Sequence, residues 1–171
     1  KIVQLGAEDA ERITMPNEGN ADWVLAASNK DNRKELQWTG NTKTSAYVIR
    51  TADGAKKLVA ANVQANFNAS PAGKYVYWYD EAKKNYFTYD VATGATKNVT
   101  EKIKVLIYEE DNDVPDHPNP YGVMGWSNDD KIFYVYDRYD VWNVDPDAVA
   151  TPVTIIDPAK MPRKNKITYR Y

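Results

Sequence analysis

The sequence predicts an all-β protein built from β-propeller blades. Three observations carry this prediction: an excess of Tyr and Trp, strand-like runs separated by turn residues, and one pattern repeated along the chain. Thirteen Tyr and five Trp stand against three Phe, and aromatic rings with a polar tip suit the half-buried faces of strands. Repeats of about 40 to 50 residues with about four strands each are typical of blades. We therefore expect a single partial propeller domain over residues 1–171, with about three four-stranded antiparallel units.

The clearest predicted unit covers residues 63–104. A turn that begins with Ser, at residues 70–74 (SPAGK), precedes a predicted strand at 75–80 (YVYWYD). A second predicted strand follows at 85–90 (NYFTYD), and a Thr-Gly pair at 93–94 supplies the turn of a further hairpin. This pattern indicates a meander of antiparallel strands.

A second predicted unit, residues 121–158, repeats this pattern in register. Residues 126–131 (WSNDDK) align without a gap with residues 69–74 (ASPAGK), 57 positions earlier. Because a Ser-led turn in register is hard to obtain by chance, the repeat favours blades over a β-sandwich or a long meander of similar hairpins. The strands expected in this unit are 132–137, 139–145 and 152–157.

A more divergent unit is expected at residues 20–62, with strands at 23–28 (WVLAAS) and 45–50 (SAYVIR) and a closing segment at 51–59. A complete propeller typically has 4 to 8 blades, so three units do not close a ring. The chain is then a fragment of a longer propeller, or several copies assemble as a homo-oligomer. The start at Lys1 and the strand-like residues 166–171 favour the fragment.

Composition excludes several classes of function. The formal net charge is −2, from 22 basic and 24 acidic residues. The chain therefore has no overall positive electrostatic field that would favour binding to nucleic acid or to an anionic membrane. The chain has no Cys, which removes disulfides, thiolate metal sites and cysteine nucleophiles. No apolar run approaches the ~20 residues of a membrane-spanning helix, and no cofactor motif is present.

Several strings are similar to the propellers of a known peptidase clan. Residues 70–77 (SPAGKYVY) resemble the blade motif of TolB-like and dipeptidyl peptidase IV-like propellers. Residues 89–94 (YDVATG), 118–126 (PNPYGVMGW) and 135–142 (VYDRYDVW) resemble the propeller of large bacterial prolyl oligopeptidase-type serine peptidases. This resemblance implies a non-catalytic propeller domain and, as its partner, an α/β-hydrolase catalytic domain of the same parent protein.

The same resemblance implies a role as scaffold and substrate-access filter for peptides, in the periplasm or outside the cell. No catalytic residue is predicted in this chain, because no G-x-S-x-G nucleophile elbow is present; residues 125–129 (GWSND) end in Asp129 rather than Gly. Whether the whole protein is an enzyme then depends on the presumed hydrolase domain.

An acidic, Pro-rich insert at residues 108–120 carries the candidate site. It contains five carboxylates and the only His of the chain, His117. In dipeptidyl peptidase IV a Glu pair after a Tyr binds the free amino terminus of the substrate, and the resemblance implies this role for Glu109 and Glu110. Carboxylates neutralise and orient an ammonium group by charge-assisted hydrogen bonds.

Other interpretations of this insert remain open. Asp111, Asp113 and Asp116 offer oxygen ligands for Ca²⁺, but the spacing lacks the Gly and distal Glu of an EF-hand loop, and no metal site is predicted. The simplest interpretation is a solvated, Pro-braced loop between two blades. Nearby, Arg138 lies between Asp137 and Asp140, which we interpret as structural bracing of a tight turn.

Two other functions compete with the peptidase propeller. The first is a stand-alone propeller of the cell envelope that binds a protein partner without catalysis. The second is a propeller that binds or cleaves glycans, for which the aromatic residues are permissive but no convincing carboxylate pair is found.

Overall fold

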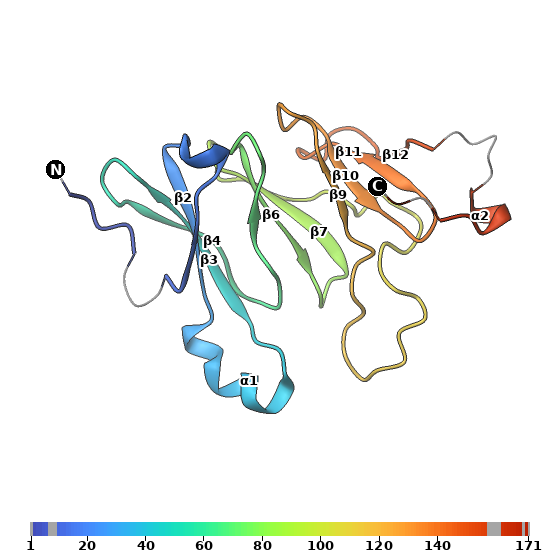
Figure 1. Cartoon of the computed structure of the whole chain (residues 1–171), viewed down its shortest axis with the longest axis horizontal. Coiled ribbons are helices and arrows are strands. Elements are labelled where there is room, and N and C mark those ends of the chain that lie inside the picture. Colours follow the sequence, from blue (N-terminus) through green and yellow to red (C-terminus); the bar gives the residue numbers. More distant parts are fainter. Residues whose placement is uncertain (1, 7–9, 157–161, 169, 171) are drawn as a thin grey trace.

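The computed structural model describes residues 2–6, 10–156, 162–168 and 170, and its strands form three four-stranded antiparallel sheets. Figure 1 shows the sheets arranged one after another along the longest axis of the molecule. In each sheet the strands are neighbours in chain order, which is the meander of a propeller blade. The predicted all-β fold of three four-stranded antiparallel units is confirmed, and the arrangement is propeller-like.

Each sheet is defined by four consecutive strands. The first sheet contains β1 (Arg12–Thr14), β2 (Trp23–Ser28), β3 (Thr44–Arg50) and β4 (Lys56–Val63). The second sheet contains β5 (Asn68–Ala69), β6 (Tyr75–Asp80), β7 (Asn85–Asp90) and β8 (Thr96–Asn98). The third sheet contains β9 (Val123–Trp126), β10 (Phe133–Tyr136), β11 (Val141–Val144) and β12 (Val153–Thr154).

Helical segments are short and lie outside the sheets. They are the 3₁₀ turns η1 (Asn17–Gly19) and η2 (Lys30–Asn32) and the helices α1 (Arg33–Thr39) and α2 (Pro162–Asn165). None of the described helices is long and apolar enough to cross a membrane.

The central strands of the sheets agree with the sequence prediction, and the strands at the sheet edges agree less well. The expected strands at 23–28, 75–80 and 85–90 have the bounds of β2, β6 and β7. The first strands of the first two sheets were not predicted, because all three residues of β1 are exposed and β5 has only two residues, so neither shows an apolar alternation. The last expected strand of the third unit shortens to β12, and its final residue, Asp157, lies outside the described residues.

The predicted strand at residues 166–171 does not form in the part that is described. Lys166 belongs to a turn, and residues 167, 168 and 170 have no regular secondary structure. Residues 169 and 171, like Lys1, lie outside the described residues.

Two hydrophobic cores lie between the sheets. Trp23 and Leu25 of the first sheet pack with Val76 and Trp78 of the second. Tyr79 and Tyr86 of the second sheet pack with residues of the third, among them Phe133, Val135 and Val144. Because successive side chains of β6 point to opposite faces, this one strand contributes to both cores.

The Ser-led turns of the second and third sheets have the same hydrogen bonds. The Ser70 Oγ accepts the backbone N–H of Tyr75 at 2.9 Å, and the Ser127 Oγ accepts that of Ile132 at 3.0 Å. Both donors and both acceptors are 57 positions apart, as in the aligned sequence. The alignment therefore identified equivalent turns.

A buried carboxylate joins these two turns. Asp130, which is 1% exposed, accepts the Ser70 hydroxyl at 2.5 Å. It also accepts the backbone N–H groups of Ala72 at 3.0 Å and Lys74 at 3.1 Å. One side chain of the third sheet thus satisfies three donors of the second, and hydrogen bonds to a charged group are stronger than neutral ones.

The outer faces of the end sheets are covered by segments near the chain ends. On the first sheet, Leu5 and Ala10 pack against the buried residues Val24, Ala26 and Ile49. On the third sheet, the Arg170 guanidinium lies 4.6 Å from the ring centroid of Tyr136. These segments shield apolar faces that otherwise contact water.

A second buried carboxylate, Asp137, organises the β10–β11 hairpin. It accepts the N–H groups of Tyr139 at 2.6 Å and Asp140 at 2.9 Å and the indole N–H of Trp142 at 2.7 Å. The Arg163 guanidinium forms an ion pair with the same carboxylate. The carboxylate is fully buried and is therefore paired and hydrogen-bonded, as buried charges require.

We predict that Asp130→Asn lowers the free energy of unfolding by about 1–3 kcal/mol, because it removes the buried charge that three donors share. Asn tolerates the positive φ of 57° at this position, so the substitution tests the hydrogen bonds rather than the backbone. Urea denaturation of the purified chain measures the difference.

Asp129→Asn is the matched control for this prediction, because the Asp129 side chain is 47% exposed and belongs to the same turn. The control should lose clearly less stability than Asp130→Asn. Equal losses in the two variants would show that the turn, and not the bridge between the sheets, determines the effect.

Candidate functional site

The acidic insert is a loop closed at its base. It connects β8 to β9, and Tyr108 and Pro120 form an isolated antiparallel bridge. The backbone N–H of Glu109 donates to the carbonyl of Asn119 at 2.9 Å, which extends this closure. The loop projects from the sheets on the same side as α1 (Figure 1).

Asp116 organises the outer part of the loop. Its carboxylate accepts the backbone N–H of His117 at 2.7 Å, and its carbonyl accepts the Asn112 amide at 3.0 Å. Asn41, which follows α1, also donates to the Asp116 carboxylate. These Asp and Asn contacts stabilise the turns of a solvated loop between two sheets.

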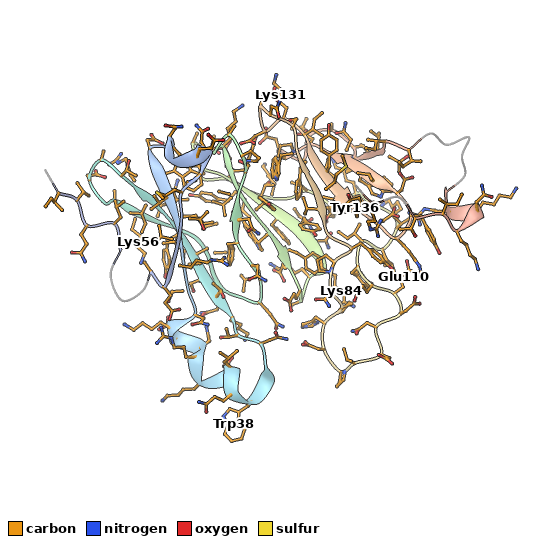
Figure 2. The ribbon with its side chains drawn as sticks, viewed as in Figure 1. Trp38, Lys56, Lys84, Glu110, Lys131 and Tyr136 are labelled. Carbon is orange, nitrogen blue, oxygen red and sulfur yellow. The ribbon has the colours of Figure 1, made fainter. Side chains whose placement is uncertain are left out.

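The two predicted site residues line one pocket of about 470 Å³. Figure 2 labels Glu110 on the loop beside the third sheet. Glu109 and Glu110 are both exposed, so the pair is solvated rather than buried. The other residues that line this pocket are Asp111, Asn112, Asp113, Tyr121, Arg138, Thr168 and Arg170.

Arg138 ties the loop to the third sheet. One guanidinium nitrogen lies 2.7 Å from a carboxylate oxygen of Asp111, and another lies 3.9 Å from one of Glu110. The hydrogen bond with Asp111 raises the pKa of Arg138. The ion pairs of Arg138 are with these loop residues and not with Asp137, which pairs with Arg163.

Tyr121 adds a hydroxyl to the pocket. Its oxygen accepts the backbone N–H of Glu110 at 3.3 Å, and burial of the ring raises the pKa of the phenol. The hydroxyl therefore stays protonated at neutral pH and keeps one hydrogen to donate.

The charges of the pocket favour a cation. Four carboxylates, those of Glu109, Glu110, Asp111 and Asp113, line it together with two guanidiniums, those of Arg138 and Arg170. Arg138 is closer to Asp111 than to Glu110, so its pairing with Glu110 is the weaker of the two. An ammonium group has the charge and the donors to bind there.

The calcium interpretation gains no support. Within the described residues, no group of three or more His, Asp or Glu side chains is arranged to hold a metal ion, so Asp111, Asp113 and Asp116 are not brought together.

Ser127, the Ser of the incomplete nucleophile motif at residues 125–129, has a structural role. Its hydroxyl donates to Asp129 at 2.9 Å and accepts the N–H groups of Lys131 and Ile132.

Sequence reasoning brought Glu109 and Glu110 together but missed the two arginines. Arg138 was noticed only beside Asp137 and Asp140, and Arg170 lies far along the chain. The excess of acidic residues in the insert is the sequence feature that could have indicated these arginines, because neighbouring carboxylates are stabilised by cations from other segments.

Comparison with known proteins adds no family assignment. No protein-family model matches the chain, and no curated protein matches its sequence. The resemblance to peptidase propellers therefore stays a prediction.

We predict that Arg138→Gln loosens the acidic loop without unfolding the sheets. The variant loses both contacts between the loop and the β10–β11 hairpin, so amide hydrogen exchange in residues 109–117 should become about two- to tenfold faster. Hydrogen exchange followed by NMR or mass spectrometry measures this change.

Arg50→Gln serves as the control, because Arg50 pairs with Asp53 within a single turn of the first sheet. This variant should leave exchange in residues 109–117 unchanged. If Arg138→Gln also leaves it unchanged, the Arg138 contacts do not hold the loop in solution.

Proposed function

We propose that this chain is a non-catalytic blade segment of a β-propeller in a dipeptidyl peptidase IV- or prolyl oligopeptidase-like serine peptidase, in the periplasm or outside the cell. It acts as a scaffold and as a filter for peptide access. Glu109 and Glu110 bind the free amino group of the peptide. The observation that carries this proposal is the shared pocket of these two carboxylates with Tyr121 and two arginines.

The chemistry of the pocket fits the end of a peptide. A peptide amino terminus presents an ammonium group close to a carbonyl oxygen. The Glu carboxylates are acceptors for the ammonium, while the guanidiniums of Arg138 and Arg170 are donors for the carbonyl. One pocket thus offers acceptors for the ammonium group and donors for the carbonyl oxygen.

The exposure of the two Glu side chains sets the expected strength of binding. Solvated ion pairs contribute little free energy, so the isolated chain should bind an amino terminus weakly. Such a site orients and selects a peptide, and a covering hydrolase domain would strengthen it by excluding water.

The blade architecture supports the filtering role. Blades of antiparallel strands arranged around an axis leave a central channel, whose width limits what can enter. The three sheets have the strand order of such blades. A folded protein is then rejected by size, and a short or unfolded peptide is admitted.

A second candidate, a propeller that binds a protein partner without catalysis, is favoured by α1. Trp38 on this helix is 88% exposed and Leu36 is 43% exposed, and Figure 2 shows Trp38 directed away from the sheets. A helix of seven residues is marginal in water unless one face is packed. Exposed Trp is typical of the centres of protein interfaces.

We predict that the chain binds a short peptide with a free amino terminus and not the same peptide after acetylation. Glu109→Gln and Glu110→Gln should each weaken binding about two- to fivefold, because each removes one solvated ion pair. NMR titration with the two peptides measures the affinities and shows which amides respond.

Glu101→Gln is the matched control, since Glu101 is an exposed glutamate outside the pocket. It should leave the affinity unchanged. Equal binding of the free and the acetylated peptide would refute amine recognition, and loss of a protein partner in Trp38→Ala, with the Glu variants unaffected, would favour the second candidate.

A further inference from the structure

A second pocket lies between the first and second sheets, away from the acidic loop, with which it shares no lining residue. Its volume is about 670 Å³, within the range of small-molecule sites. The strand ends that surround it are the start of β2, the end of β3, the start of β4 and the adjoining ends of β6 and β7. Neither Glu109 nor Glu110 lines this pocket.

One part of the pocket is apolar and rigid. Trp23, Val48 and Val91 line it, and the first two belong to paired strands of the first sheet. The indole N–H of Trp23 donates to the carbonyl of Gly73 at 3.0 Å, which fixes the ring between the sheets. These side chains form a surface for an apolar ligand body.

The charged lining is predominantly basic. Four cationic residues, Arg50, Lys56, Lys57 and Lys74, line the pocket with two acidic residues, Asp22 and Asp90. The Asp90 carboxylate already accepts the backbone N–H groups of Ala92 at 2.8 Å and Thr93 at 2.9 Å. The pocket is therefore suited to an anion.

Lys57 is the cation best placed to receive it. Arg50 is paired with Asp53, and the Lys74 ammonium donates to the carbonyl of Asp129 at 2.7 Å. Lys57 has no ion pair among the described residues, and its ammonium lies 5.7 Å from the ring centroid of Tyr89.

Gly94 creates the space that Lys57 occupies. A Cβ at this position would overlap the Lys57 ammonium, and the flexible lysine side chain would have to shift. Gly94 also has a positive φ of 77°, which glycine adopts without strain. The Lys57 ammonium, from β4 of the first sheet, therefore lies against the hairpin that follows β7 in the second sheet.

An unsatisfied hydroxyl lies beside the same position. The Tyr89 hydroxyl is 3.5 Å from the place where a Gly94 Cβ would stand. Tyr89 is 2% exposed, and its hydroxyl has no hydrogen-bond partner among the described residues. A buried polar group without a partner costs free energy, but Tyr89 does not line the pocket and is not counted as a ligand contact.

We propose that this pocket binds a small molecule with an apolar body and one anionic group, a carboxylate or a sulfonate. The Lys57 ammonium, which lines the pocket, binds the anionic group. Trp23, Val48 and Val91 pack against the apolar body. This site is separate from the acidic pocket and does not depend on the proposed peptide function.

The test uses two fluorescent probes that share one ring system. 8-Anilinonaphthalene-1-sulfonate has the sulfonate, and N-phenyl-1-naphthylamine lacks it. Fluorescence titration of the folded chain should give saturable binding of the sulfonate, with amide shifts at Val91, Ala92 and Gly94 in NMR spectra. Lys57→Met should weaken the sulfonate about tenfold, which corresponds to one charge-assisted contact, and should leave the neutral probe unchanged.

Lys97→Met is the matched control, because Lys97 is an exposed lysine on β8 outside the pocket. It should bind the sulfonate as the unchanged chain does. Lys57→Gln should also weaken the sulfonate and not the neutral probe, which keeps the test valid if Lys57→Met folds poorly. Absence of saturable binding, shifts confined to other sheets, or equal affinities for Lys57→Met and Lys97→Met would each overturn the proposal.

Discussion

The structure depends on one constraint: a blade strand presents apolar side chains on both faces, so each sheet needs a neighbour on each side. In β6, Val76 and Trp78 face the first sheet, while Tyr77 and Tyr79 belong to the core with the third. The alternation of side chains therefore determines the stacking. The end sheets have only one neighbouring sheet in this chain, and residues such as Leu5 and Arg170 cover their outer faces.

Polar ties between neighbouring elements add specificity to this stacking. Asp130 connects the turns of two sheets, and Asp137 holds its own hairpin together with Arg163. Apolar contacts alone allow one sheet to slide over another. Directional hydrogen bonds to a buried carboxylate oppose such sliding, because it would break them. The two candidate sites lie at such junctions, one where the acidic loop joins the third sheet and one between the first and second sheets.

Strong periodic patterns were predictable from the sequence, and contacts between distant segments were not. The aromatic alternation of β6 and the turn at Ser70 set the bounds of the central strands and the register of the repeat. By contrast, β1 has no buried residue and α1 shows no packed face, so neither has a pattern to detect. Glu109 and Glu110 were found because they are adjacent, whereas the approach of Lys57 to Tyr89 depends on the stacking of two sheets.

The arrangement of cores has a consequence for how the molecule opens. The first and third sheets share no hydrophobic cluster among the described residues, so each interacts mainly with the second. Such a molecule approximates a linear array with nearest-neighbour coupling, in which the end units open before the middle one. The second sheet then acts as the cooperative centre, and partial opening at either end would expose one of its aromatic faces while the other stays covered.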